Sequence, residues 1–372
     1  MNYKNKARLL AYYLPQFHPV PENDEWWGKG FTEWTNVTKA KPLFKGHYQP
    51  HFPADLGYYD LRIPEVREAQ AEMARNHGIE GFCYYHYWFG NGKQLLEKPI
   101  NEVLALGKPD FPFCLCWANE TWKGFPFGET RRTLIEQKYF GREDIDAHFN
   151  YLLKAFTDER YLQVDGKPIF QILTPRDMPN PLEITDSLRE LAHQSGLKGL
   201  FLVAGYRALE EWDALKNGFD AVVSSSFSRA FDPRNRLSLR WIINGILHNK
   251  YFADNDKLQK LFKRYYRVHE YKDVIQNIKI NREYNFDYYP CVVPNWDNTP
   301  RSGIKGHVVT NSTPDLFKIH LTEAVNYVQK YAEDHKIIFI KSWNEWAEGN
   351  YLEPDKQFGL QYLEVIKECV SQ

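Results

Sequence analysis

The feature that most constrains the fold is a series of eight short apolar runs, separated by segments with helical periodicity. Most of the runs are continuously apolar, which is typical of parallel strands covered on both faces. We expect strands at Arg8–Leu14, Gly78–Tyr85, Phe111–Trp117, Pro168–Leu173, Gly199–Ala204, Asp220–Phe227, Tyr289–Pro294 and Lys336–Ser342. This order predicts an α/β fold, a single (β/α)8 TIM barrel with long βα loops, and an open doubly wound sheet is the alternative.

The segments between the strands supply the expected helices. Amphipathic periodicity predicts them at Ile63–His77, Ile145–Phe156, Pro181–Ser195, Leu209–Asn217 and Pro314–His335. No Gly-x-Gly-x-x-Gly motif follows the first strand, which disfavours a Rossmann fold. We expect residues 1–372 to form a single catalytic barrel domain, with a basic and aromatic insertion at 228–280 between the sixth and seventh strands.

Charge and cysteine content narrow the class of protein. The 47 basic and 48 acidic residues nearly cancel, which argues against a nucleic-acid partner. Five cysteines without framework spacing are typical of reduced thiols, and the first apolar run is too short for a signal peptide. These features predict a cytoplasmic protein.

The insertion carries the strongest local charge in the chain. Ten Arg or Lys residues and three Asp residues lie within 229–267, together with apolar and aromatic side chains. One interpretation is a helical excursion with a solvated basic face. The other is a peripheral surface that contacts an anionic membrane or a lipid-linked glycan.

Aromatic and polar residues cluster where the predicted strands end. Barrel enzymes place their chemistry at the carboxyl ends of the strands, and flat aromatic rings suit the C–H faces of sugars. An aromatic-rich core is the alternative reading of the same composition. We expect substrate contacts from Tyr13, His18, Trp34, Tyr85, His86, Trp88, Trp117, Asn119, Glu120, Tyr206, Trp296, Asp297, Trp343, Asn344 and Trp346.

Two glutamates directly after the last strand are the candidate catalytic residues. Glu345 and Glu348 are three residues apart, so one helical turn would place both side chains on the same side. Glycosidic cleavage needs a pair of carboxyl groups held in different protonation states. The alternative is that they form a capping box or exposed acids of a first turn.

A metal or cofactor is not expected. His47 and His51 are four residues apart, but Pro50 lies between them and two histidines fall short of the usual ligand count. Cys114 and Cys116 lie in an apolar run without further ligands nearby in the sequence.

Six motifs together resemble a known family. The chain resembles the WbsX-type domain of bacterial lipopolysaccharide and O-antigen gene clusters, which is related to glycoside hydrolase family 99, the endo-α-1,2-mannosidases and mannanases. The motifs are Ala11 to Pro19, Gly30 to Trp34, Gly81 to Phe89, Cys116 to Glu120, Trp296 to Arg301 and Trp343 to Asp355.

The resemblance implies a (β/α)8 barrel, no metal and a retaining mechanism. It assigns Glu345 as the base that deprotonates the 2-hydroxyl of the substrate, and Glu348 as the acid and base. The chain departs from the mannosidases at Ala347, where they carry His, a position that bears on sugar specificity.

Three functions remain open at this point. The first is a retaining, endo-acting glycoside hydrolase on a manno-configured or related bacterial surface polysaccharide. The second is a glycosyltransferase or transglycosidase of O-antigen biosynthesis. The third is a carbohydrate-binding protein without catalysis, which would keep the aromatics but need not keep both acids.

Overall fold

The structure is a computed structural model that describes residues 5–44, 46–124, 132–205, 212–224, 230–231, 267–278, 280 and 284–371. The predicted contact Tyr206 lies outside these residues. So does the basic segment 229–267, apart from residues 230, 231 and 267. The predicted role of that segment therefore stays a prediction.

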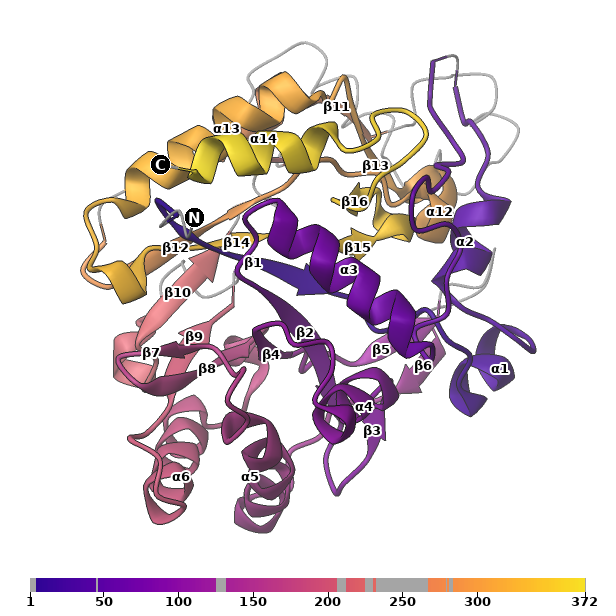
Figure 1. The fold of residues 1–372 in the computed structure, drawn as a ribbon. Coiled ribbons are helices and arrows are strands. Elements are labelled where there is room, and N and C mark those ends of the chain that lie inside the picture. Colours follow the sequence, from indigo (N-terminus) through magenta and orange to yellow (C-terminus); the bar gives the residue numbers. More distant parts are fainter. Residues whose placement is uncertain are drawn as a thin grey trace.

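Within the described residues, eight parallel strands form a closed ring (Figure 1). The ring closes because β1 pairs with β2 on one side and with β14 on the other. The strands are β1 (Arg8–Tyr13), β2 (Gly81–Trp88), β4 (Phe113–Trp117), β8 (Lys167–Ile172), β9 (Phe201–Ala204), β10 (Ala221–Ser224), β12 (Asp287–Val292) and β14 (Ile337–Ile340). The barrel prediction is confirmed and the open sheet is excluded. Every predicted strand overlaps an observed one.

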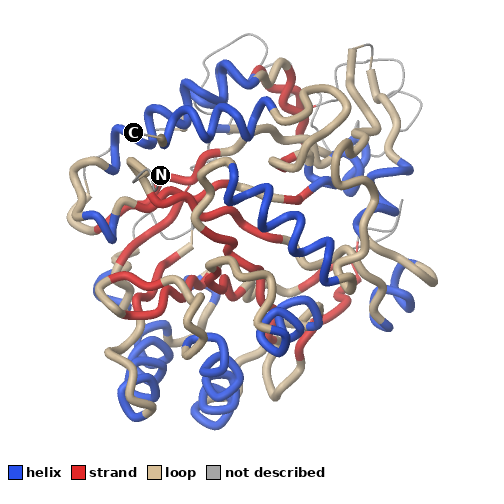
Figure 2. The backbone as a smooth tube through the Cα atoms, in the orientation of Figure 1, coloured by secondary structure: helices blue, strands red, loops and turns tan. Residues whose placement is uncertain are grey.

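Helices surround the ring of strands (Figure 2). The main ones are α3 (Pro64–Asn76), α4 (Lys98–Leu106), α5 (Arg142–Phe156), α6 (Pro181–Gln194), α13 (Pro314–Val328) and α14 (Gln361–Val370). The predicted helix at 314–335 is too long, because α13 ends at Val328 and only a 3-10 turn, η6 (Glu333–His335), follows. Of the predicted helix at 209–217, the described part holds only η3 (Leu215–Asn217). Within the described residues, no helix is long and apolar enough to span a bilayer.

Side-chain alternation along each strand decides which residues face the barrel interior. Tyr12 points inward, and its hydroxyl donates to Gln171 Oε1 of β8 across the barrel at 2.9 Å. Its neighbour Tyr13 points outward, and its hydroxyl donates to Gln70 Oε1 of α3 at 2.6 Å. Both rings are buried, because the strands are covered on both faces.

Elaborate loops gather at one end of the barrel, away from the two termini (Figure 1). They follow the carboxyl ends of the strands, which is where barrel enzymes build their sites. These loops carry β3 (Gln94–Leu95), α1 (Pro21–Trp27), α2 (Glu33–Lys39), β5 (Trp122–Gly124), β6 (Arg132–Ile135), η1 (Pro175–Asp177), β11 (Arg267–Glu270), α11 (Tyr271–Asn277), α12 (Thr299–Ser302), η5 (Gly303–Lys305), β13 (His307–Thr310), β15 (Asn344–Glu345), η7 (Trp346–Glu348) and β16 (Asn350–Tyr351). The opposite end is plainer and includes the short β7 (Gln163–Val164), which pairs with β8.

Candidate active site

The segment that follows β14 forms a tight hairpin that holds both glutamates. Strands β15 and β16 pair across the 3-10 turn η7, and the Ser342 hydroxyl donates to Asn350 O at 2.8 Å and accepts from Glu345 N at 3.0 Å. The turn ends at Gly349, whose φ of +64° and close approach to Asp297 N leave no room for a β-carbon. The expected helical turn is thus present as a 3-10 turn.

Glu345 lies deep in the mouth of the barrel. The residue is only 4% exposed, and its Oε1 lies 3.2 Å from Lys341 Nζ. Burial, together with the negative charge of Glu348, outweighs the attraction of Lys341 and raises the pKa of Glu345 to about 7. Glu345 is therefore the glutamate of the pair that retains a proton near neutral pH.

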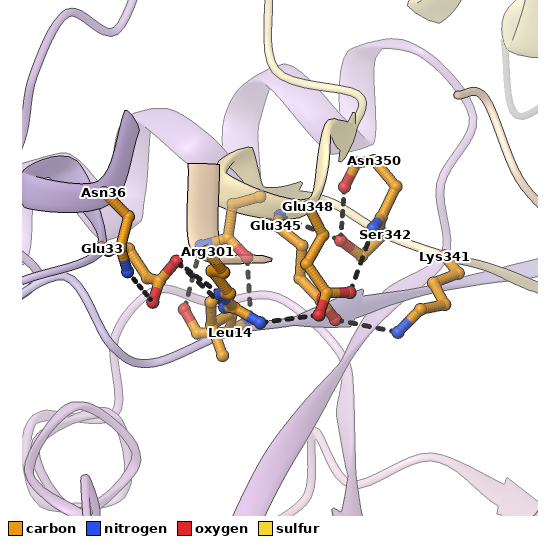
Figure 3. A network of polar contacts seen from close by, with 10 residues as sticks. Leu14, Glu33, Asn36, Arg301, Lys341, Ser342, Glu345, Glu348 and Asn350 are labelled. Carbon is orange, nitrogen blue, oxygen red and sulfur yellow. Dashed lines mark hydrogen bonds and ion pairs between the residues drawn. The ribbon is translucent and has the colours of Figure 1, made fainter. Parts of the chain in front are cut away.

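Glu348 is held in the opposite state by an arginine. Arg301 of α12 donates to Glu348 Oε1 at 2.7 Å and also pairs with Glu33 Oε2 at 2.9 Å (Figure 3). Burial would raise the pKa of Glu348, but the cations Arg301 and Lys341 outweigh it and lower that pKa to about 2. Glu348 is a carboxylate at neutral pH.

Lys341 occupies the interior position directly after β14. Its ammonium donates to the Tyr85 hydroxyl at 3.3 Å, and it lies 5.8 Å from the Tyr85 ring and 5.6 Å from the Trp296 ring. Burial alone would lower the pKa of Lys341, but the charges of Glu345 and Glu348 raise it. The ammonium is therefore fixed as a cation between two aromatic rings and the candidate acids.

The two carboxyl groups act on each other directly. Each carboxyl group shifts the pKa of the other, through its charge and through a side-chain hydrogen bond. Such a pair titrates as a unit, and it carries one proton between pH of about 2 and about 7. One neutral and one charged carboxyl group in contact is the combination that acid–base chemistry at a glycosidic bond needs.

A buried carboxyl group anchors the hairpin from behind. Glu353 accepts from Trp346 Nε1 at 2.6 Å, from Gln70 Nε2 at 2.6 Å and from the Tyr59 hydroxyl at 2.8 Å. The Trp346 ring stacks on Tyr351 with centroids 3.8 Å apart. These contacts fix the turn that carries Glu348.

Three predicted contact residues belong to this scaffold. Trp346 is 1% exposed and Trp34, which packs on it at 5.5 Å between centroids, donates its Nε1–H to Tyr59 O. Asn344 is fully buried and bonds the backbone of Leu14 through both ends of its amide. In the structure these three residues support the hairpin, and their contact with substrate stays a prediction.

Asp297 is also an anchor. Its carboxylate accepts from His47 at 2.7 Å, from Gln49 at 2.6 Å and from the Thr299 hydroxyl at 2.6 Å, and its backbone N donates to Glu348 O. Burial would raise the pKa of Asp297, but these hydrogen bonds lower it. The described residues contain no cluster of three or more His, Cys, Asp or Glu side chains suited to a metal.

Several predicted contact residues pack between the strands and the outer helices, and their contact with substrate stays a prediction. On β2, Tyr85 points inward, whereas His86 bonds His148 of α5 and Trp88 donates to Asp144 of the same helix. The residues that pack between the strands and the outer layer are Tyr13, His86, Trp88, Trp117 and Trp343. Trp88 and Trp117 line a separate cavity of about 230 Å³ between α5 and α6.

The remaining predicted contacts lie in the loops that follow β1 and β4. Asn119 joins two loops, because its amide bonds Thr174 N and Thr174 O, each at 2.9 Å. Glu120 lines an open cavity of about 450 Å³ with Lys123. His18 is 1% exposed, and burial lowers its pKa.

Of the predicted binding residues, Tyr85 and Trp296 reach the surroundings of the glutamates through Lys341, and Asp297 reaches them through its backbone bond to Glu348 O. Four residues that were not predicted as site residues also belong to it. They are Glu33, Tyr87, Arg301 and Lys341. Strand alternation would have selected Tyr87 beside Tyr85 and rejected His86 and Trp88, and the same rule places Lys341 on the face of Phe339.

The fold is a (β/α)8 barrel that carries two interacting glutamates after its last strand. A solved structure described as a glycoside hydrolase-like protein matches with a TM-score of 0.59 at 13% identity, covering 100% of this chain and 96% of that one. The endo-alpha-mannosidase of family GH99 from Bacteroides thetaiotaomicron matches with a TM-score of 0.54 at 15% identity, covering 97% and 95% of the two chains. At these identities the likeness concerns the fold.

The chain belongs to the family described as glycosyltransferase WbsX, whose model matches residues 9–366. The protein WxcX of Xanthomonas campestris pv. campestris strain B100 is 35% identical over 367 residues. That match covers 98% of this chain but 50% of WxcX, so the chain spans about half the length of this relative.

Proposed function

We propose that this barrel is a retaining, endo-acting glycoside hydrolase that cleaves a manno-configured or related bacterial surface polysaccharide. The observation that carries the proposal is the pair Glu345 and Glu348, in direct contact at the mouth of the barrel and held in opposite protonation states. Carbohydrate-cleaving enzymes need such a pair at the scissile bond.

The family resemblance implies participation of the sugar's own 2-hydroxyl, and the direct interaction between the two carboxyl groups supports it. In the proposed first step, Glu345 takes the 2-hydroxyl proton, O2 attacks C1, and the leaving oxygen departs with the proton of Glu348. In the second step, Glu348 takes a proton from water, which opens the 1,2-anhydro ring at C1, and Glu345 returns its proton to O2.

The resting state of the pair needs one adjustment before this chemistry. The roles require the shared proton on Glu348, whereas the free protein holds it on Glu345. Because the two groups are hydrogen-bonded, the proton can pass between them without crossing solvent. A leaving oxygen that approaches Glu348 and competes with Arg301 would favour that transfer.

The test is turnover of α-1,2-linked mannan and O-antigen oligosaccharides, followed by mass spectrometry. We expect Glu345→Gln and Glu348→Gln each to lower kcat by roughly 10²–10⁴-fold, the usual loss when a general acid or base is removed. An activated aryl leaving group should largely restore Glu348→Gln but not Glu345→Gln, because it needs no protonation.

Glu364→Gln, on the exposed face of α14, is the matched control and should keep full activity. Full turnover of a natural substrate by either active-site variant would rule out the assigned role of that glutamate.

A transferase or transglycosidase is the second candidate, and the description of the family favours it. The same two acids could pass the sugar from the anhydro intermediate to a glycan hydroxyl instead of water. Chain-length analysis separates the outcomes, since transfer yields longer glycans and hydrolysis yields new reducing ends. Thermal stabilisation by nucleotide sugars would favour a nucleotide-dependent transferase.

The sugar is the least determined part of the proposal. Ala347 lies between the two acids and is fully buried, and the mannosidases carry His at this motif position. A panel of oligosaccharides that differ only in the configuration at C2 would decide the sugar class directly.

A further inference from the structure

Lys341 is a cation that the proposed chemistry does not use. It enters the site from the end of β14, four residues before Glu345, and its Nζ lies 3.2 Å from Glu345 Oε1. The side chain is only 24% exposed. Within the barrel mouth it also donates to the Tyr85 hydroxyl and lies against the Trp296 ring.

Each member of the glutamate pair thus has its own cation. Lys341 contacts Glu345, while Arg301 contacts Glu348 at 2.7 Å (Figure 3). A nearby positive charge favours the ionised form of the carboxyl group that it touches. The two cations therefore pull the shared proton in opposite directions, Lys341 toward Glu348 and Arg301 toward Glu345.

We propose that Lys341 is a positioning residue that biases the shared proton away from Glu345 and toward Glu348, and so favours the arrangement in which Glu345 acts as the base. The inference rests on the proposed function for its catalytic meaning. The proton position itself does not depend on the substrate.

The other groups around Glu345 cannot replace this cation. The titratable and charged groups that act on it or lie beside it are Lys341 after β14, Glu348 on η7, Arg301 on α12, Tyr85 and Tyr87 on β2 and Cys291 on β12. The tyrosines and the cysteine are neutral, because burial raises their pKa values. Glu33, which lies behind Arg301, neutralises part of the arginine charge.

The first test is a pH profile of kcat/KM for Lys341→Met, a substitution of similar length without charge. We expect the basic limb, where the pair loses its last proton, to move up by roughly one to three pH units. We also expect the plateau of kcat/KM to fall by roughly 10–10³-fold. The same change in free energy lowers the fraction of molecules that carry the shared proton on Glu348. Lys341→Arg should restore both.

The position of the basic limb and the height of the plateau together show whether Glu345 is the base or the acid. A moved limb with an undiminished plateau would mean that Glu345 is the acid, which overturns the proposal. An unmoved limb would also overturn it. Lys318→Met, which removes an exposed ammonium 2.6 Å from Glu368, is the matched control and should change neither quantity.

The second test needs no substrate. Infrared difference titration follows the neutral carboxylic acid band, and subtraction of the Glu345→Gln spectrum separates Glu345 from the buried Glu353. In Lys341→Met we expect the midpoint of the Glu345 band to rise by roughly one to three pH units. An unchanged midpoint in a folded variant overturns the proposal. A raised midpoint without turnover of any glycan supports it and refutes the proposed function instead.

Discussion

At the scale of single residues, the site is defined by which charges touch which carboxyl groups. Glu345 and Glu348 lie only three residues apart, yet burial and nearby charges drive their pKa values to about 7 and about 2. This separation turns two identical side chains into a proton donor and a proton acceptor.

The wild-type protein should therefore show a characteristic pH dependence. A singly protonated pair persists between pH of about 2 and about 7. We expect kcat/KM to fall tenfold per unit as pH rises above about 7, because the pair then loses its only proton. Measurement of kcat/KM from pH 4 to about 9 checks this, and a rate that continues to rise beyond about pH 8 would contradict it.

At the scale of elements, the βα loops form one interlocked unit. The hairpin β15–β16 is tied to Leu14 after β1 through Asn344, to α3 through Gln70 and Glu353, and to α12 through the ion pair of Arg301 with Glu348. Elements from the first and last parts of the sequence thus stabilise the same hairpin. Aromatic residues that resembled a sugar platform in the sequence, such as Trp34 and Trp346, belong to that support.

Removal of the Glu353 carboxyl group tests how much its hydrogen bonds stabilise the hairpin. Glu353→Ala leaves three buried donors, on Trp346, Gln70 and Tyr59, without their acceptor. We expect the free energy of unfolding to fall by about 3 kcal/mol, since each orphaned buried donor costs about 1–3 kcal/mol. Urea denaturation measures the change.

Glu353→Gln is the matched variant for this experiment. It keeps one acceptor oxygen and should lose less stability than Glu353→Ala. Equal stability of Glu353→Ala and the wild type would show that the network contributes nothing.

At the scale of the whole molecule, a cluster of charged side chains links the elements at the end of the barrel opposite the site. His335, just before β14, lies 2.6 Å from Asp287 at the start of β12 and 3.0 Å from Asp165 in the β7–β8 turn. Burial alone would lower the pKa of His335, but the hydrogen bonds and charges of these two carboxylates raise it. The His335 imidazolium thus links the residue before β14 to the start of β12 and to the β7–β8 turn, and we call this cluster the His335 clamp.

The His335 clamp should make the free energy of unfolding depend on pH. A raised pKa in the folded protein means that the stabilisation is fully present below about pH 6.5 and is lost as pH rises through the folded value. We expect His335→Gln to cost about 1 kcal/mol or less at pH of about 5.5, and less still at pH of about 9. Urea unfolding at both pH values checks this, with the exposed His193→Gln as control. A cost that grows with pH would contradict the clamp.

The sequence by itself determined the order and approximate position of the eight strands and the place of Glu345 and Glu348 after the last one. These features are local, because apolar runs, turn residues and spacing along the chain encode them directly. The sequence also determined family membership, through motifs spread over nearly the whole length.

Only the tertiary structure decided which side chains meet. Lys341 touches Tyr85 across 256 residues, and Arg301 touches Glu33 across 268. Alternation fixes which residues of a strand share a face, but only the folded barrel shows which face is the interior, and it places Tyr13, His86 and Trp88 on the outer one. Lys341 and Glu345 are only four residues apart in the sequence, but only the closed barrel buries them together at its mouth.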